Sequence, residues 1–210
     1  MEITKDHKVY LYGASGHALV IMDSLRASGF RVEALVDDNP ELTELDKVTV
    51  LHESLGLSPF IVSIGVNATR RKVVEKLMAQ GAIFGQAIHP SAVLSPSVKV
   101  GEGTVIMAGA IVNAATQIGR HCIINTGASV DHECQLGDYV HISPHATLCG
   151  NVSVGQGTWV GAGSTIIQGV KVGRWCMVGA GSVVTKDIPD GYLAVGNRCK
   201  LIKLINKDLS

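Results

Sequence analysis

The sequence has few aromatic residues, no excess of charge of either sign, no long apolar run and no Cys-x-x-Cys pair among its five cysteines. Aromatic residues make up 4% of the 210 residues, and Lys+Arg and Asp+Glu both total 18. A chain without net charge is not expected to bind nucleic acid. A membrane-spanning helix needs about 20 apolar residues in a row, so no membrane insertion is expected. The cysteine spacing is typical of a reducing compartment, and residues 1–10 lack the apolar core of a secretion signal, so we expect a cytoplasmic protein.

Glycine, by contrast, is abundant, and much of it follows a repeat in the second half of the chain. From Leu94 to Val184, sixteen positions spaced by six are all Leu, Ile or Val, and the residue two before each is small or β-branched. Five glycines recur every 18 residues, namely Gly101, Gly119, Gly137, Gly155 and Gly173. A period of six does not fit an α-helix, but it fits a short strand followed by a corner, and three such units make one coil. We therefore predict a parallel β-helix over residues 88–188, with the aliphatic side chains inside.

The first half of the chain predicts a separate α/β unit. The expected strands are residues 8–12, 30–36, 60–64 and 82–88, and the expected helices are residues 17–28 and 68–80. The polar face of the second helix is expected to carry Arg70, Arg71, Lys72 and Lys76. The chain therefore divides into a short Rossmann-like domain (1–87), the β-helix (88–188) and a C-terminal tail (189–210). In this tail the basic, amphipathic segment Leu201–Leu209 predicts a packing helix.

Three loops of the α/β unit are candidates for ligand binding. Alternating strands and helices give a parallel sheet, which binds ligands at the carboxyl ends of its strands. The loops expected there are 13–17, 37–38 and 65–67. The Gly-Ala-Ser-Gly-His loop offers a helix N-terminus to a phosphate, and two acids about 20 residues later, Asp37 and Asp38, are placed to bind ribose or base donors. We expect a nucleotide-sugar here; an NAD site or a packing domain without ligand are the alternatives.

Four histidines lie off the inward positions of the repeat: His121, His132, His141 and His145. None is therefore expected in the β-helix core, which leaves solvent, a subunit interface or an active site. His132 and His141 are nine residues apart, half of one coil, so in one chain they face opposite sides. They can share a site only between two neighbouring prisms, as in a closed ring of three.

The motifs together resemble a known family. Strand–Gly-Ala-Ser-Gly-His–helix, Asp37-Asp38, Ser-Val-Asp-His-Glu-Cys (129–134) and Gly-Asp-Tyr-Val-His (137–141) are similar to the sialic-acid/bacillosamine branch of hexapeptide-repeat sugar acetyltransferases, over nearly the whole chain. The resemblance implies a left-handed β-helix and a homotrimer. It implies His132 as general base, with Glu133 raising its basicity, and acetyl-CoA contacts at His141, Ala162 and Ala180. The nucleotide-sugar contacts that it implies are Ser15, Gly16, His17, Asp37, Asp38 and Gly65.

The chemistry of acetyl transfer fits such a base. An amine that attacks a thioester must lose a proton, and a histidine next to a carboxylate can accept it near neutral pH. The function expected from the resemblance is transfer of the acetyl group of acetyl-CoA to the 4-amino group of a UDP-linked amino-dideoxy sugar. Acetylation of a hydroxyl, as on sialic acid, and a trimeric scaffold without catalysis are the alternatives. No metal is expected, because no histidine within residues 103–112 completes a zinc site with His141 and His145.

The remaining cysteines and tryptophans have structural interpretations. Cys122, Cys134 and Cys176 occupy small inward positions, so a packing role is expected for each. Trp159 and Trp175 lie off the inward positions, where they either line the acetyl-CoA groove or pack between coils and subunits. The segment 196–200, Gly-Asn-Arg-Cys-Lys, lacks the proline of the Gly-x-Pro-Ala-Lys run with which many hexapeptide transferases end their prism.

Overall fold

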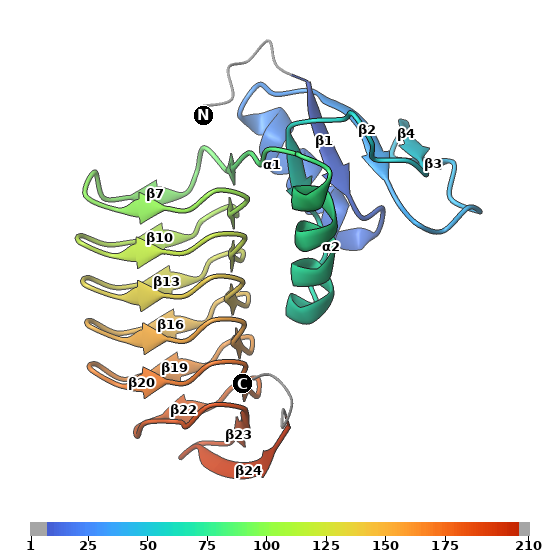
Figure 1. The fold of residues 1–210 in the computed structure, drawn as a ribbon. Helices are drawn as coiled ribbons and strands as arrows, with labels where there is room; N and C mark the ends of the chain where they lie inside the picture. Colours follow the sequence, from blue (N-terminus) through green and yellow to red (C-terminus); the bar gives the residue numbers. More distant parts are fainter. Residues whose placement is uncertain (1–7, 206–210) are drawn as a thin grey trace.

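In the computed structural model, which describes residues 8–205, a small α/β unit lies beside the first coils of a long three-sided prism (Figure 1). The predicted fold class, an α/β unit followed by a parallel β-helix, is confirmed. No helix within the described range is long and apolar enough to cross a membrane. The expectation that residues 1–10 carry no secretion signal concerns mainly residues 1–7, which fall outside the described residues, as does the end of the predicted C-terminal helix.

The α/β unit is a five-stranded sheet in the order β3-β4-β2-β1-β5, with parallel pairing except at the β3–β4 hairpin. Its elements are β1 (Val9–Tyr12), α1 (Gly16–Ala27), β2 (Val32–Val36), β3 (Glu44–Leu45), β4 (Val48–Leu51), β5 (Phe60–Val62) and α2 (Asn67–Ala79). The central strands β1, β2 and β5 are short, mostly apolar and mostly buried, as strands covered on both faces are, whereas β3 and β4 toward the sheet edge are only partly buried. The hairpin was not expected, because its turn residues, Asp46 and Lys47, adopt positive φ without a glycine to signal it. The carboxyl ends of β1, β2 and β5 meet at one edge, which brings the three predicted loops together.

From β6 to β22 the prism consists of two-residue strands that pair with the strand 18 residues further on, and two longer strands, β23 and β24, end it. Face 1 contains β6 (Ala87–Ile88), β9 (Val105–Ile106), β12 (Ile123–Ile124), β15 (His141–Ile142), β18 (Trp159–Val160), β21 (Met177–Val178), β23 (Tyr192–Val195) and β24 (Lys200–Leu204). Face 2 contains β7 (Val93–Leu94), β10 (Ile111–Val112), β13 (Ser129–Val130), β16 (Thr147–Leu148), β19 (Thr165–Ile166) and β22 (Val183–Val184). Face 3 contains β8 (Lys99–Val100), β11 (Gln117–Ile118), β14 (Gln135–Leu136), β17 (Ser153–Val154) and β20 (Lys171–Val172). The pairing register stays at 18 from β6 to β22, as predicted, and shortens to 16 where β21 pairs with β23.

The predicted inward side chains form the prism core. The aliphatic positions from Ile106 onward and Cys122, Cys134 and Cys176 are buried there, as expected, whereas Leu94 and Val100 in the first coil are partly buried. Buried hydroxyls at the small inward positions are satisfied by the backbone of a neighbouring corner: Thr104 donates to the Gly119 carbonyl at 2.9 Å, and Thr158 donates to that of Gly173 at 2.6 Å. Burying these small hydroxyl side chains therefore costs little free energy of folding, because each hydroxyl has a hydrogen-bond partner.

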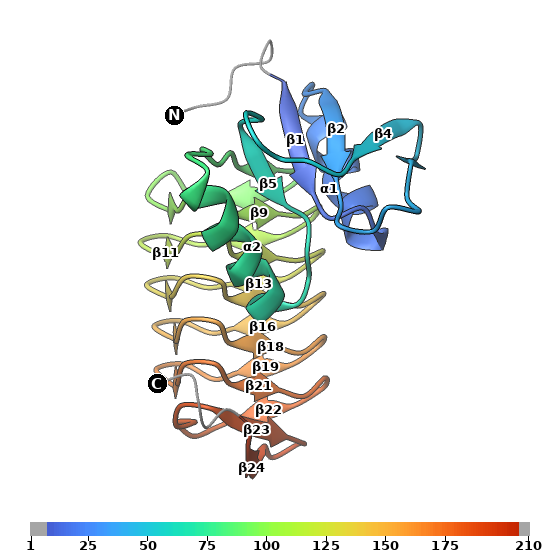
Figure 2. The same ribbon diagram turned by 45° about the vertical axis from the view of Figure 1, so that its right-hand side comes forward.

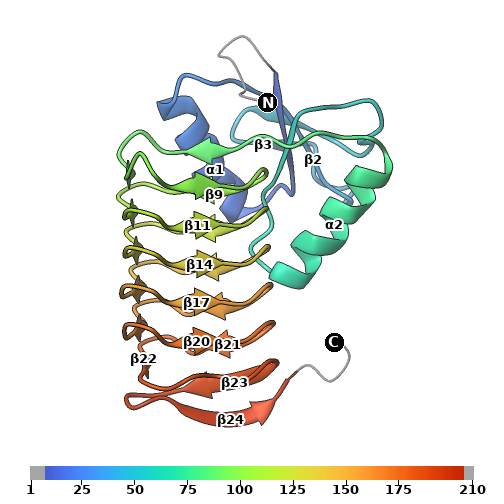
Figure 3. The same ribbon diagram turned by 60° about the vertical axis from the view of Figure 1, so that its left-hand side comes forward.

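The α/β unit packs against face 1 and the corner between faces 3 and 1. α1 residues share a buried cluster with Val105, Met107 and Ile123 of the first coils. α2 runs alongside the coils (Figure 2), and its first residue, Asn67, donates to the Gly157 carbonyl at 3.0 Å. In the view of Figure 3, α1 lies over the first coils and α2 lies at the side of the prism. The α/β unit thus covers the part of face 1 formed by β6, β9 and β12. The part formed by β15, β18 and β21 stays open.

Two expectations about polar side chains were wrong at this contact. His121 is 2% exposed, packed edge-on to Phe84 (ring centroids 4.6 Å apart) and stacked on Tyr139 (5.4 Å), so it lies neither in solvent nor in a site. Arg70 is 1% exposed rather than on the polar face of its helix. The sequence pattern treats each helix and coil by itself, whereas both residues are buried by the other half of the chain.

The strand and tail predictions also need correction. Of the predicted strand 82–88, only Ala87–Ile88 forms a strand, and it belongs to face 1 of the prism; Phe84 makes a single bridge to Phe60. The predicted C-terminal helix is instead β24, which pairs antiparallel with β23. The end of the prism offers an unpaired strand edge, which is the physical reason that the tail continues the sheet.

Candidate active site

The first cavity lies where the α/β unit meets the open part of face 1 and has a volume of about 370 Å³. Its walls are Tyr12, Gly13, Ser15, Asp37, Asp38, Ile64, Gly65, Val66, Thr69, Val73 and Trp159. Four of the predicted nucleotide-sugar contacts, Ser15, Asp37, Asp38 and Gly65, are therefore brought together here; Gly16 and His17 follow Ser15 in the first turn of α1. We call this the α/β cavity.

Both helices of the α/β unit begin at the α/β cavity without a capping side chain. Ser15 precedes α1 and Val66 precedes α2, and neither side chain accepts a hydrogen bond from its own helix; the first turns contain no acidic residue either. The first N–H groups of a helix need an acceptor and carry partial positive charge. Two such termini at one cavity favour an anionic ligand with phosphate groups.

The two aspartates at this cavity have different surroundings. Asp37 accepts hydrogen bonds from the Ala14 N–H (2.8 Å) and the Asn39 N–H (2.9 Å), so its carboxylate ties the strand ends together. Asp38 accepts from the Tyr12 hydroxyl at 2.7 Å and from Lys76 at 3.2 Å, and these bonds hold the pKa of the Asp38 carboxyl below its usual value. Asp38 is exposed and keeps one carboxylate oxygen for a ligand, whereas both oxygens of Asp37 are used by the backbone.

A second cavity, of about 490 Å³, lies on the open part of face 1 and the corner next to it. Its walls are Asn125, His141, Ser143, Pro144, Trp159, Gly161, Ala162, Met177, Val178, Gly179 and Ala180. The three predicted acetyl-CoA contacts, His141, Ala162 and Ala180, all line it. We call this the prism cavity. Of the two tryptophans, Trp159 lines both cavities, whereas the Trp175 ring is buried beside Arg71 of α2, 5.7 Å from its guanidinium.

His141 and His17 face each other between the two cavities. Their ring centroids are 6.5 Å apart, His141 stacks on Trp159 at 5.0 Å, and Asn125 Nδ2 lies 3.1 Å from His141 Nε2. Burial, together with the nearby Arg70 cation, lowers the pKa of His141 to about 3 and that of His17 to about 4. Both imidazoles are neutral at pH 7 and can act as hydrogen-bonding groups without adding charge.

The buried histidines predict an acid-sensitive fold. Burial lowers the pKa of His121 to about 4, so the folded state resists protonation of His17, His121 and His141 while the unfolded chain takes up protons below about pH 6.5. Stability is therefore fully present above pH 6.5 and is lost as the pH falls toward 4. One pKa unit corresponds to roughly 1.4 kcal/mol, so we expect a loss on the order of several kcal/mol by pH 4, measured by urea unfolding. A free energy of unfolding that stays constant over this range would contradict the neutral-histidine assignment.

His132 and Glu133 form a pair outside both cavities. Glu133 Oε2 lies 3.0 Å from His132 Nδ1, and the Asp131 carboxylate accepts from the His132 backbone N–H at 2.8 Å. The pair occupies the corner between faces 2 and 3, opposite face 1, and both side chains are exposed in a single chain. With Nδ1 held by a carboxylate, Nε2 is the ring nitrogen of His132 that is left to accept a proton from a substrate.

Gly150, one coil after His132, makes room for the imidazole. A Cβ at this position would approach His132 Cε1 and Nε2 to 2.6 Å, and Gly150 is not among the glycines with positive φ. Gly150→Ala is therefore expected to move the ring without straining the backbone. A displacement near 1 Å typically costs about 10²-fold in rate, so we expect kcat to fall by roughly 10- to 100-fold with an unchanged melting temperature. Gln168→Ala, in the same corner one coil further on, is the control; equal activity of both variants would show that Gly150 does not position His132.

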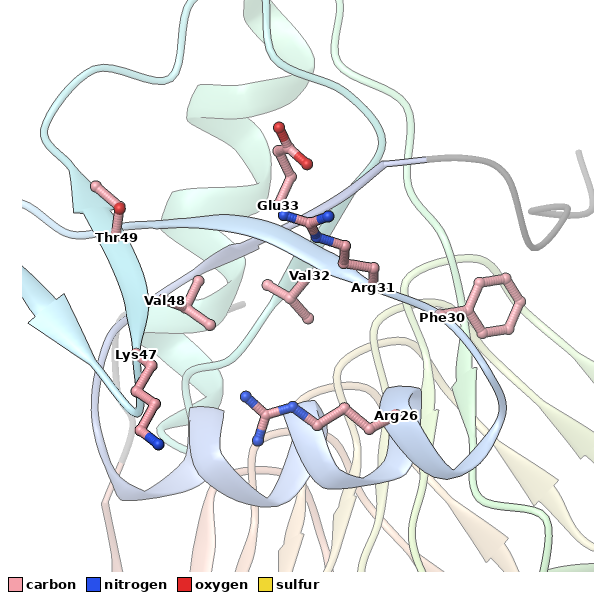
Figure 4. A pocket seen from close by; sticks show the side chains of 8 residues that line it. All are labelled: Arg26, Phe30, Arg31, Val32, Glu33, Lys47, Val48 and Thr49. Atoms are coloured by element: carbon pink, nitrogen blue, oxygen red, sulfur yellow. The ribbon is translucent and has the colours of Figure 1, made fainter.

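A third cavity, of about 340 Å³, lies at the opposite end of the α/β sheet and has a different character (Figure 4). Arg26, Arg31 and Lys47 surround it together with Glu33. Arg26 is paired with Asp46, and Glu33 with Lys8, so these ion pairs mainly fasten the β3–β4 hairpin and β2 to their neighbours. None of the predicted site residues lines it. Within residues 8–205, no three His, Cys, Asp or Glu side chains group closely enough to hold a metal ion.

Comparisons with known proteins agree with this arrangement. A family model described as the PglD N-terminal domain matches residues 8–77, and the bacterial transferase hexapeptide model matches residues 115–150 and 151–186. The curated UDP-N-acetylbacillosamine N-acetyltransferase of Bacillus subtilis (strain 168) is 42% identical over 110 residues, which are 48% of this chain and 51% of that protein. The matched stretch thus spans about half the length of this curated relative.

Two solved structures match over nearly their full length. PerB from Caulobacter crescentus, in complex with CoA and GDP-perosamine, is 43% identical, with a TM-score of 0.89 over 94% of this chain and 98% of that chain. The acetyltransferase domain of PglB from Neisseria gonorrhoeae FA1090, in complex with acetyl coenzyme A, is 35% identical, with a TM-score of 0.86 over 93% of this chain and 98% of that chain. The resemblance inferred from the sequence motifs is confirmed.

Proposed function

We propose, from the premise that this chain belongs to the nucleotide-sugar N-acetyltransferases with a PglD N-terminal domain and hexapeptide repeats, that it transfers the acetyl group of acetyl-CoA to the 4-amino group of a UDP-linked amino-dideoxy sugar. The observation that carries this proposal is the adjacency of the α/β cavity and the prism cavity on face 1. The cytoplasmic location expected from the sequence remains a prediction.

The α/β cavity suits the nucleotide end of such a substrate. The two uncapped helix termini can donate N–H groups to the diphosphate, and the free oxygen of Asp38 can accept from ribose or base. His17 Nε2 is buried without a hydrogen-bond partner among the described residues, and a ligand oxygen would satisfy it. The prism cavity, which is mostly apolar, suits the pantetheine arm and the acetyl group of acetyl-CoA, as the relatives with bound CoA support.

The reaction needs one base and one oxyanion site. The neutral amine attacks the thioester carbonyl carbon, and a new C–N bond forms while the carbonyl electrons move to oxygen. His132 Nε2 accepts the proton from nitrogen, with Glu133 stabilising the imidazolium. Collapse of the tetrahedral intermediate then breaks the C–S bond, and the CoA thiolate recovers a proton from His132. Backbone N–H groups of the prism cavity are the candidate donors to the oxyanion.

A homotrimer would bring His132 to the cavities of a neighbour. The prism cavity lies at the corner between faces 1 and 2, and His132 lies at the corner between faces 2 and 3, so the two flank face 2. The outward residues of face 2 are uncharged: Val93, Ile111, Ser129, Thr147, Thr165 and Val183. Those of face 3 are more polar: Lys99, Gln117, Gln135, Ser153 and Lys171. In a ring of three prisms with face 2 toward the axis, the corner between faces 1 and 2 of one prism lies beside the corner between faces 2 and 3 of the next. The prism cavity of one subunit would then lie beside His132 of its neighbour.

Acetyl-CoA turnover, followed as free thiol, tests the function. We expect turnover with UDP-4-amino-4,6-dideoxy-N-acetylglucosamine. Turnover only with GDP-perosamine would mean that the substrate carries GDP rather than UDP. Turnover only with sialic acid would indicate O-acetylation. Joint refolding of two variants, His132→Ala, which lacks the proposed base, and His141→Ala, which lacks a proposed acetyl-CoA contact, tests the intersubunit site. Mixed trimers are expected to regain part of the activity, because at one interface the intact His132 of a His141→Ala subunit faces the intact His141 of a His132→Ala subunit. No recovery, with mixed trimers present, would contradict an intersubunit site.

A further inference from the structure

The two cavities have one wall in common. Of the described residues that line them, Trp159 alone belongs to both. Trp159 lies in β18 on the open part of face 1, and its side chain is half-buried. A molecule bound in either cavity therefore contacts the same indole.

Two neighbours hold the indole in a fixed orientation, and backbone pairing on both sides holds its strand. Its Nε1 donates to Ser143 Oγ at 2.7 Å, its ring stacks on His141 with an interplanar angle of 15°, and its backbone pairs with those of His141 and Met177. Ser143 and His141 come from the preceding coil and Met177 from the following one. The wall between the cavities is thus a rigid aromatic surface.

We infer that Trp159 is a positioning residue that couples the binding of the two substrates, an inference that rests on the proposed function. Each ligand covers only part of the indole, and the second ligand completes an apolar contact that the first leaves open to water. The acceptor and the thioester then meet over the edge of one ring, which holds the amine and the carbonyl carbon close together. Such coupling is reciprocal: CoA must tighten binding of the sugar nucleotide by the same factor by which the sugar nucleotide tightens binding of CoA.

The chain contains two tryptophans, so one substitution makes Trp159 an isolated reporter. Trp175 lines neither cavity, and Trp175→Phe leaves Trp159 as the sole source of indole emission. In this variant we expect CoA alone and UDP-4-amino-4,6-dideoxy-N-acetylglucosamine alone each to change the emission. Isothermal titration calorimetry of the wild type is expected to show at least fivefold tighter binding of either ligand when the other is saturating.

The matched variants are Trp159→Phe, which keeps an aromatic ring but loses the Ser143 bond and part of the wall, and Trp159→Ala. In Trp159→Phe we expect the coupling factor to fall below twofold and both KM values to rise, with an unchanged far-UV circular dichroism spectrum. If both ligands bind but one leaves the Trp159 emission unchanged, or if the coupling persists in Trp159→Phe, the inference is wrong and the proposed function stands. If neither ligand binds the wild type, the proposed function fails and the inference fails with it.

Discussion

Replacing His132 by alanine is expected to lower kcat for acetyl transfer by about 10²–10⁴-fold, the usual contribution of a positioned general base. The side chain lies outside both cavities of its own chain and contacts Glu133 but neither cavity wall, so KM for acetyl-CoA and for the sugar nucleotide should change little. Steady-state kinetics with free-thiol detection measures both parameters. Because His132 is exposed, the melting temperature should stay within experimental error of that of the wild type.

Replacing the neighbouring carboxylate, Glu133, gives a second variant with a smaller expected effect. Glu133→Gln keeps the size of the side chain but removes the charge 3.0 Å from His132 Nδ1. The imidazolium that forms during the reaction then loses its charged partner, so kcat should fall, though less than in His132→Ala. Gln168→Ala, at the same prism corner two coils further on, controls for loss of a corner side chain and should be fully active. Full activity of His132→Ala would exclude it as the base.

Replacing Arg70 by alanine is expected to destabilise the protein by about 3–5 kcal/mol. The guanidinium is buried between α2 and the prism and donates to five acceptors: the carbonyls of Ile64, Gly65, His121 and Tyr139 and the side-chain oxygen of Asn67. Burial lowers the pKa of Arg70 to about 10, so it stays charged at neutral pH. Without it, several buried oxygens lose their only cationic donor, which is among the most costly changes in a folded protein.

Urea unfolding of Arg70→Ala measures this loss, with Lys72→Ala as the control. Lys72 is two residues further along the same helix and exposed, so its replacement should change the free energy of unfolding by less than about 0.5 kcal/mol. Since Arg70 also holds the carbonyls of Ile64 and Gly65 at the edge of the α/β cavity, KM for the sugar nucleotide should rise in Arg70→Ala. Equal stability of the two variants would mean that water replaces the guanidinium.

The sequence by itself determined the β-helix and the grouping of most site residues. The inward side chain of each six-residue unit depends only on that unit and its neighbours 18 residues away, so periodicity was sufficient to predict the register and the core. The meeting of the loops after β1, β2 and β5 follows from parallel pairing alone, which is why Ser15, Asp38 and Gly65 could be predicted at one cavity.

The contact between the two halves of the chain was decided only by the tertiary structure. Arg70 has the spacing of a solvent-facing helix residue, and His121 has that of an outward corner residue; each is buried because the other half supplies carbonyls and aromatic rings to it. Trp159 was left between two interpretations for the same reason, since the α/β unit builds the α/β cavity against it. Local pattern fixes which way a side chain points from its own strand or helix, but burial depends on what another segment places over it, and that is a property of the folded chain alone.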